Sequence, residues 1–138
     1  MEIREATAED SDAIFDLANQ LHESLNVART EFQSVFAEIL QRQDSMCLVA
    51  SNRSKVVGYI TASVHPVLIQ GENSAYVDEI VVLPDIRGKG IGTALMSQME
   101  HWARKHKCGL VGLASGGATL FYEQLGYQSR ASYYKKYL

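Results

Sequence analysis

A short apolar run, a glycine-rich turn and a helix start follow one another within residues 80–93, and this stretch constrains the chain most. Ile80–Leu83 is apolar and β-branched, which predicts a strand buried on both faces, and Pro84 marks its end. From Ile91 onward, apolar residues recur at helical spacing. Three glycines lie at the junction of the two elements, at residues Gly88, Gly90 and Gly92. The glycines are therefore predicted to lie where a strand passes into a helix N-terminus.

A turn of this kind is suited to binding an anion. The first N–H groups of a helix have no intrahelical acceptor, and the helix dipole is positive at that end. Glycines let the backbone approach a bulky ligand, and Arg87 and Lys89 add positive charge. The spacing matches neither a Walker A loop nor the G-x-G-x-x-G dinucleotide pattern. We therefore predict a pyrophosphate site made by Arg87, Gly88, Lys89, Gly90, Ile91, Gly92 and Thr93.

Length and composition restrict the class of protein. The chain has 138 residues, 46% of them hydrophobic and 21% charged, which predicts one globular domain over residues 1–138. A net charge of −3 argues against nucleic acid as a partner, and no apolar segment is long enough to cross a membrane. The histidines show no metal-ligand spacing, so no metal is expected. Two cysteines, Cys47 and Cys108, are expected to be reduced in a cytoplasmic protein.

Periodicity predicts the element order β, α, α, β, β, β, α, β, α, β, β. The expected strands and helices after the first helix are, in order, a helix capped by Thr30, strands 46–50, 56–64 and 75–83, helix 91–106 with Gly109 as its stop, strand 110–114, helix 118–125 and two closing strands within 127–137. Residues 65–74 are expected to form a loop, because they hold Pro66 and Gly71.

The turn and the element order together resemble the Gcn5-related N-acetyltransferase (GNAT) superfamily. Its acetyl-CoA loop reads Arg/Gln-x-x-Gly-x-Gly/Ala, matched here by Arg87, Gly90 and Gly92. The resemblance implies an α/β (α+β) fold, with a central mixed, mostly antiparallel sheet of about seven strands flanked by four helices. It also implies acetyl-CoA as co-substrate, bound where two strands splay apart, with its pantetheine arm bonded to the backbone of Ile80, Val81 and Val82.

Glu79 is the candidate general base. In strict alternation it shares a face with Val77, Val81 and Leu83, where a carboxylate is costly unless it is paired or solvated. The residues alone leave open that this end of the strand frays, that a bulge turns Glu79 outward, or that Asp78 or a water relay serves instead. The resemblance favours Glu79, because many GNAT enzymes carry a general-base glutamate on this strand.

Tyr122 is the candidate general acid. It lies in Leu120–Tyr127, which is similar to the family signature x-Tyr-Glu-x-x-Gly-Phe/Tyr, whose tyrosine protonates the departing CoA thiolate. An ordinary packing role is the alternative. The chain departs from the family at Ala114–Ala118, where many members carry an asparagine that contacts pantetheine. Backbone, Ser115 or Thr119 is expected to hold the arm there.

The resemblance implies direct acetyl transfer to a primary amine in a ternary complex. The closing residues 126–138 look like those of aminoalkylphosphonate and aminoglycoside N-acetyltransferases, which favours a small molecule as acceptor. A protein (N-terminal or lysine) acetyltransferase and a non-catalytic acyl-CoA-binding sensor are the alternatives. The acceptor pocket is expected from residues 19–29, from the 65–74 loop and from the closing strands. The tyrosine-rich last strand, Tyr133–Leu138, is expected to pair two copies as a homodimer.

Overall fold

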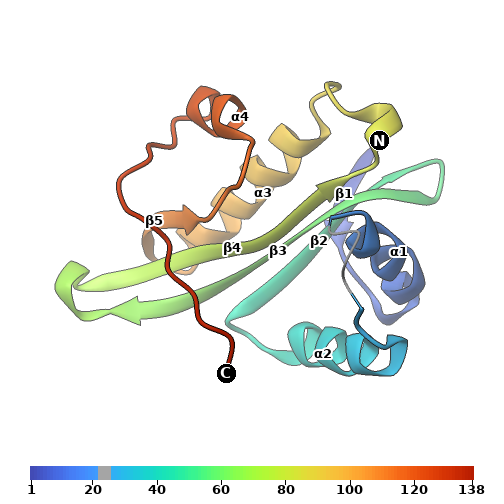
Figure 1. The fold of residues 1–138 in the computed structure, drawn as a ribbon, viewed down its shortest axis with the longest axis horizontal. Coiled ribbons are helices and arrows are strands. Elements are labelled where there is room, and N and C mark those ends of the chain that lie inside the picture. The colour runs from blue at the N-terminus through green and yellow to red at the C-terminus, as the bar shows by residue number, and fades with distance from the viewer. Residues whose placement is uncertain (22–25) are drawn as a thin grey trace.

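The computed structural model describes residues 1–21 and 26–138. Its centre is a five-stranded sheet with the strands in chain order, β1-β2-β3-β4-β5 (Figure 1). Neighbouring strands are antiparallel except β4 and β5, which are parallel because helix α3 (Ile91–Lys105) crosses between them. The strands are β1 (Glu2–Glu5), β2 (Ser45–Asn52), β3 (Lys55–Val67), β4 (Glu72–Val82) and β5 (Cys108–Leu113). The α/β class and the mixed, mostly antiparallel sheet are confirmed, with five strands in place of about seven.

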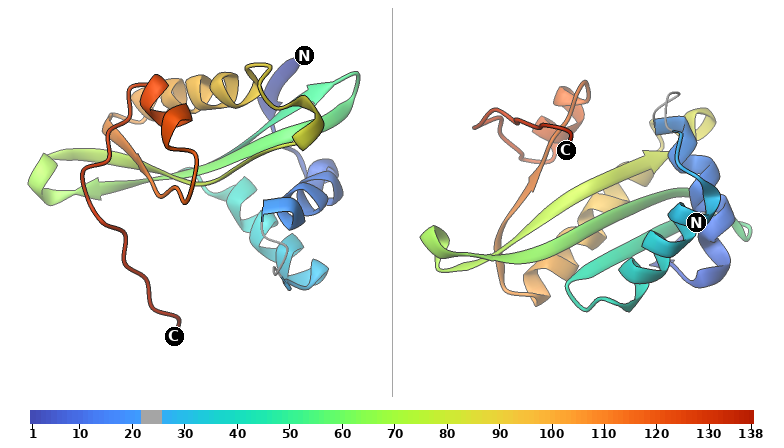
Figure 2. Two further views of the ribbon diagram at one scale, coloured as in Figure 1. Left: turned by 45° about the horizontal axis from the view of Figure 1, so that its top comes forward. Right: turned by 60° about the horizontal axis from the view of Figure 1, so that its bottom comes forward.

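Helices cover both faces of the sheet (Figure 2). They are α1 (Ser11–Leu21), α2 (Arg29–Gln41), α3 (Ile91–Lys105) and α4 (Thr119–Gln124). One core lies between the sheet and α3, whose Leu95, Met96 and Met99 are fully buried. A second core lies on the opposite face, where Ile14 and Leu17 of α1 pack on β2, β3 and β4. The α3 face and the α1/α2 face of β4 are therefore two distinct environments.

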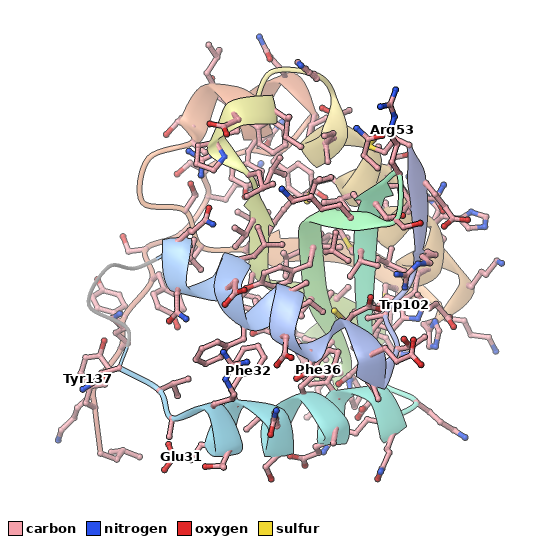
Figure 3. All side chains as sticks on the ribbon, turned by 90° about the vertical axis from the view of Figure 1, so that its right-hand side faces the viewer. Glu31, Phe32, Phe36, Arg53, Trp102 and Tyr137 are labelled. Atoms are coloured by element: carbon pink, nitrogen blue, oxygen red, sulfur yellow. The ribbon has the colours of Figure 1, made fainter. Side chains whose placement is uncertain are left out.

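Aromatic side chains join α1 to α2. Phe32 and Phe36 project from α2 toward α1 (Figure 3), and the Phe15 ring of α1 meets Phe32 edge-on at 5.1 Å. Helix α2 begins at Arg29 with Ala28 at its N-cap, two residues before the predicted Thr30 cap. Part of the predicted 19–29 contribution to the acceptor pocket, residues 22–25, lies outside the described residues.

The prediction of a loop at residues 65–74 is wrong, because most of these residues lie in strands. β3 and β4 continue as a hairpin whose tip is a single 3-10 turn, Leu68–Gln70. Pro66 is tolerated inside β3 because β2 pairs only as far as Ser63, so Pro66 has no neighbour on that side and removes no ladder bond. Leu68 and Ile69 at the tip are fully exposed.

The two predicted closing strands are absent. After α4 the chain runs as an extended tail on the α1/α2 side of the sheet (Figure 2, left), and it pairs with no strand among the described residues. Tyr134 and Tyr137 are 89% and 85% exposed. Tyrosine is common in strands, so the tyrosine-rich tail fits a strand, but a strand requires a partner edge, which this tail does not have among the described residues.

Helix α3 ends differently from the prediction. Its C-cap is His106. Lys107, and not the predicted Gly109, takes the left-handed conformation (φ 61°) that ends the helix. Gly109 lies inside β5, where a Cβ would collide with the Glu72 carboxylate. Gly109 therefore lies within a strand beside the Glu72 side chain, rather than at the end of the helix.

Candidate active site

The N-terminus of α3 presents free backbone donors. Gly88 and Gly90 have φ of 82° and 83°, values that favour glycine, and Gly90 is the N-cap with no side-chain cap hydrogen bond. The first helical bond runs from the Ala94 N–H to the Gly90 carbonyl at 3.0 Å. The N–H groups of residues 91–93 precede this first helical donor, so they have no acceptor within the helix.

Arg87 and Lys89 stand beside these donors, and both are exposed. The Arg87 Nε–H donates to the Val82 carbonyl at 3.1 Å, which ties the turn back to the end of β4. Gly92 has a further role that the sequence did not reveal, since a Cβ there would lie 3.2 Å from the Phe121 ring of α4. The third glycine thus lets α4 pack against the start of α3.

The end of β4 has a free edge. Pairing of β4 with β5 stops at Val77 and Leu113, whereas β4 continues to Val82. The β5 strand turns away from β4 at this point (Figure 2, right). The predicted splay is confirmed, and the edge of residues 78–82 that faces away from β3 has no strand partner among the described residues.

A β-bulge at Asp78 changes the predicted facing of the side chains. Thr61 pairs with Glu79 but the next residue, Ala62, pairs with Val77, so Asp78 is an extra residue on β4. Val77 consequently lies in the α3 core, whereas Val81 lies in the α1/α2 core. The prediction that Glu79 shares a face with Val77 is wrong: Glu79 lies with Thr61 and Val81 on the α1/α2 face.

Glu79 is half-buried, and its Oε1 accepts a hydrogen bond from the Tyr59 hydroxyl at 2.7 Å. Tyr59 is 1% exposed, and burial followed by the nearby Glu79 carboxylate raises the pKa of its phenol far above the ordinary value. Asp78 is exposed; partial desolvation and the Glu79 charge raise its pKa. Thr61, opposite Glu79, has a buried hydroxyl with no partner among the described residues.

Tyr122 lies in α4 and packs against the α3 core together with Ile80, Val82 and Ile91. Its ring meets those of Phe121 and Tyr127 edge-on, at 5.0 and 6.0 Å. Burial raises the pKa of Tyr122, so its hydroxyl keeps its proton at neutral pH. The structure thus gathers Tyr122 with the predicted cofactor strand and helix start, and it places Glu79 on the opposite face of the same strand.

The segment without the family's asparagine is shaped by Ser115. The Ser115 Oγ accepts a hydrogen bond from the Ala118 N–H at 3.1 Å and so stabilises the turn into α4. Gly116 and Gly117 are exposed, with no atom within 4 Å of a Cβ at either position.

Across residues 1–21 and 26–138, no group of three His, Cys, Asp or Glu side chains could hold a metal ion. The described helices include none long and apolar enough to cross a membrane.

A mixed sheet that splays beside a glycine-rich helix N-terminus is the arrangement of acetyl-CoA-dependent acyltransferases. Residues 11–127 match the acetyltransferase (GNAT) family, and the chain belongs to this family.

Relatives and solved structures agree with this assignment. The chain is 31% identical over 100 residues to an uncharacterised N-acetyltransferase of Methanocaldococcus jannaschii, a match that covers 69% of this chain and 44% of that protein. The chain therefore spans less than half the length of this relative. It is 30% identical to the aminoalkylphosphonate N-acetyltransferase of Salmonella typhimurium, covering 92% of this chain and 84% of that protein. A solved acetyltransferase of Trypanosoma brucei has the same fold, with a TM-score of 0.85, 24% identity and 99% of both chains covered.

Proposed function

We propose that this protein transfers the acetyl group of acetyl-CoA to a primary amine of a small molecule, by direct attack within a ternary complex. The observation that carries the proposal is the free edge of β4, which begins where β5 leaves it at Val77 and leads directly into the uncapped N-terminus of α3. Acetyl-CoA bound along that edge would have its pyrophosphate at the helix N-terminus, where an anion is stabilised.

The backbone supplies most of the proposed cofactor contacts. Residues 80–82 bond the pantetheine arm as an added strand would, and residues 87–93 bind the pyrophosphate. A β4 N–H directed at the thioester carbonyl stabilises the oxyanion of the tetrahedral intermediate. Acetyl-CoA is the acetyl donor that the GNAT family uses.

Two side chains carry the proposed proton transfers. Glu79, directly or through one water, takes a proton from the bound ammonium and so produces the neutral amine that attacks, since an amine with a pKa near 10 is otherwise charged at neutral pH. The neutral nitrogen forms a bond to the acetyl carbon, and the carbon–sulfur bond then breaks as Tyr122 gives its proton to the leaving thiolate. The nitrogen releases its second proton as it becomes the amide, and this proton, passed through water, restores the Tyr122 phenol. The positions of Glu79 and Tyr122 on opposite sides of the β4 edge support this division of roles; Asp78 is the alternative base.

A small-molecule acceptor is supported by the aminoalkylphosphonate relative. We propose that the acceptor approaches from the α1/α2 face, where Glu79 lies.

We further propose that residues 1–138 act as one domain in the cytoplasm, where thiols such as the free Cys47 and Cys108 stay reduced. The exposed tail suits pairing of two copies, and light scattering that finds only monomer at micromolar concentration would refute a dimer.

An amine panel tests the proposal. Release of CoA thiol is followed with 2-aminoethylphosphonate, with kanamycin, and with a peptide carrying a free N-terminus and a lysine. We expect acetyl-CoA turnover with a small amine, well above the rate without amine and lost in Glu79→Gln. Turnover with the peptide alone would indicate a protein acetyltransferase. Binding of acetyl-CoA without turnover of any amine would indicate a sensor module.

A further inference from the structure

Tyr59 contacts the proposed base, yet nothing in the local sequence singles it out. Tyr59 pairs with Val81 across the β3–β4 ladder and Glu79 pairs with Thr61, so the phenol and the carboxylate are diagonal neighbours on one sheet face. The 2.7 Å hydrogen bond between them is short, as expected for a hydroxyl that donates to a carboxylate. One oxygen of Glu79 is therefore held by a side chain from the neighbouring strand.

The phenol is a rigid support. Its ring is packed in the core between the sheet and α1, together with Ile14, Leu17 and Val49. A side chain packed at this density keeps one rotamer. Because the raised pKa of Tyr59 keeps its proton in place, the phenol is the donor and Glu79 the acceptor throughout the working range of pH.

Glu79 itself has little other support. Its side chain is half-buried, and the Tyr59 hydroxyl is the only hydrogen-bond partner that its carboxylate has among the described residues. A base acts only from within hydrogen-bond reach of the proton that it takes, and small misplacements cost large factors in rate. A group that fixes one oxygen leaves Oε2 as the oxygen available to the amine.

We propose that Tyr59 is a positioning residue for acetyl transfer, whose hydroxyl holds the Glu79 carboxylate in the orientation in which Oε2 accepts the proton of the amine. This inference rests on the proposed function, in which Glu79 is the base. The competing explanation is purely structural, since a buried phenol needs a hydrogen-bond acceptor and Glu79 provides one. The two explanations differ in whether the effect of removing the hydroxyl depends on Glu79.

A double-mutant cycle separates them. In the parent enzyme, Tyr59→Phe should lower kcat by about 10-fold with the KM for acetyl-CoA unchanged, because the base is misplaced but the cofactor site is intact. In the Glu79→Gln background, measured at high pH where residual activity remains, the same change should alter kcat by less than about twofold, since no base is left to position.

Three further variants keep the test decisive. Ile14→Val loosens the same core without removing a hydroxyl, and it should leave kcat unchanged in both backgrounds even where it lowers the melting temperature. Incorporating 4-aminophenylalanine at position 59 restores a donor and should recover part of the lost kcat. If Tyr59→Phe does not fold, 4-methylphenylalanine, which fills the space of the hydroxyl but cannot donate, takes its place in the cycle.

An equal loss of kcat in both backgrounds, or no loss in the parent enzyme, would overturn the positioning role and leave the proposed function standing. Full activity of Glu79→Gln at neutral pH would instead remove the base role of Glu79, and the role of Tyr59 with it.

Discussion

The chemistry proposed for this molecule depends above all on one residue, Glu79. The sequence identifies it as a carboxylate on an apolar strand, but the alternation of side chains alone placed it on the same face as Val77. The extra residue Asp78 reverses that relation. A bulge depends on the register with the partner strand, which no local pattern in β4 encodes. For the same reason the Tyr59 contact could be found only once β3 and β4 were aligned.

The variant Tyr122→Phe tests the proposed general acid. The variant keeps the ring packed against the α3 core and removes only the hydroxyl. We expect kcat to fall by about 10²-fold, the ordinary worth of a positioned proton donor, with little change in the affinity for acetyl-CoA. Raising the pH should not restore the rate, because it supplies no acid. A fully active variant would reduce Tyr122 to a packing residue.

Among the elements, the β4–α3 connection was the most predictable. Strand, proline, glycines and the helical period are all local signals, and the structure has β4 ending at Val82 and α3 beginning at Ile91. The contact between Gly92 and Phe121 was not predictable, because it depends on how α4 returns to α3. A substitution at Gly92 would therefore disturb packing as well as binding, which makes Gly90 the better position to test.

Gly90→Glu should weaken acetyl-CoA binding by at least about 10-fold. It adds a negative charge beside the proposed pyrophosphate site, and each 1.4 kcal/mol of lost interaction is about one factor of ten. Gly71→Glu is the matched control. Gly71 also has a positive φ (64°) and open space around a Cβ, but it lies at the tip of the β3–β4 hairpin. Calorimetry should show the loss for Gly90→Glu alone, and equal affinities for both folded variants would exclude an anion site at this turn.

For the molecule as a whole, the sequence predicted the order of the elements up to α4 and failed beyond it. Local periodicity and turn chemistry identify strands that pair with neighbours in sequence, as β2 with β3 and β3 with β4 do. The tail after Gly126 is rich in tyrosine, which is common in strands, but whether it forms a strand depends on an edge elsewhere. Local sequence therefore does not decide whether the C-terminal part of the proposed acceptor pocket forms a strand.

Acetyl transfer at the free edge of β4, as proposed, depends on Glu79 accepting the proton of the amine. The pH profile of kcat/KM for Glu79→Gln tests it most directly, because glutamine keeps the shape of the side chain and can still accept the Tyr59 hydrogen bond. We predict a loss of about 10²–10⁴-fold at neutral pH. The loss should shrink as the pH rises and free amine replaces ammonium. A pH profile that matches that of the parent enzyme throughout would show that Glu79 is not the base.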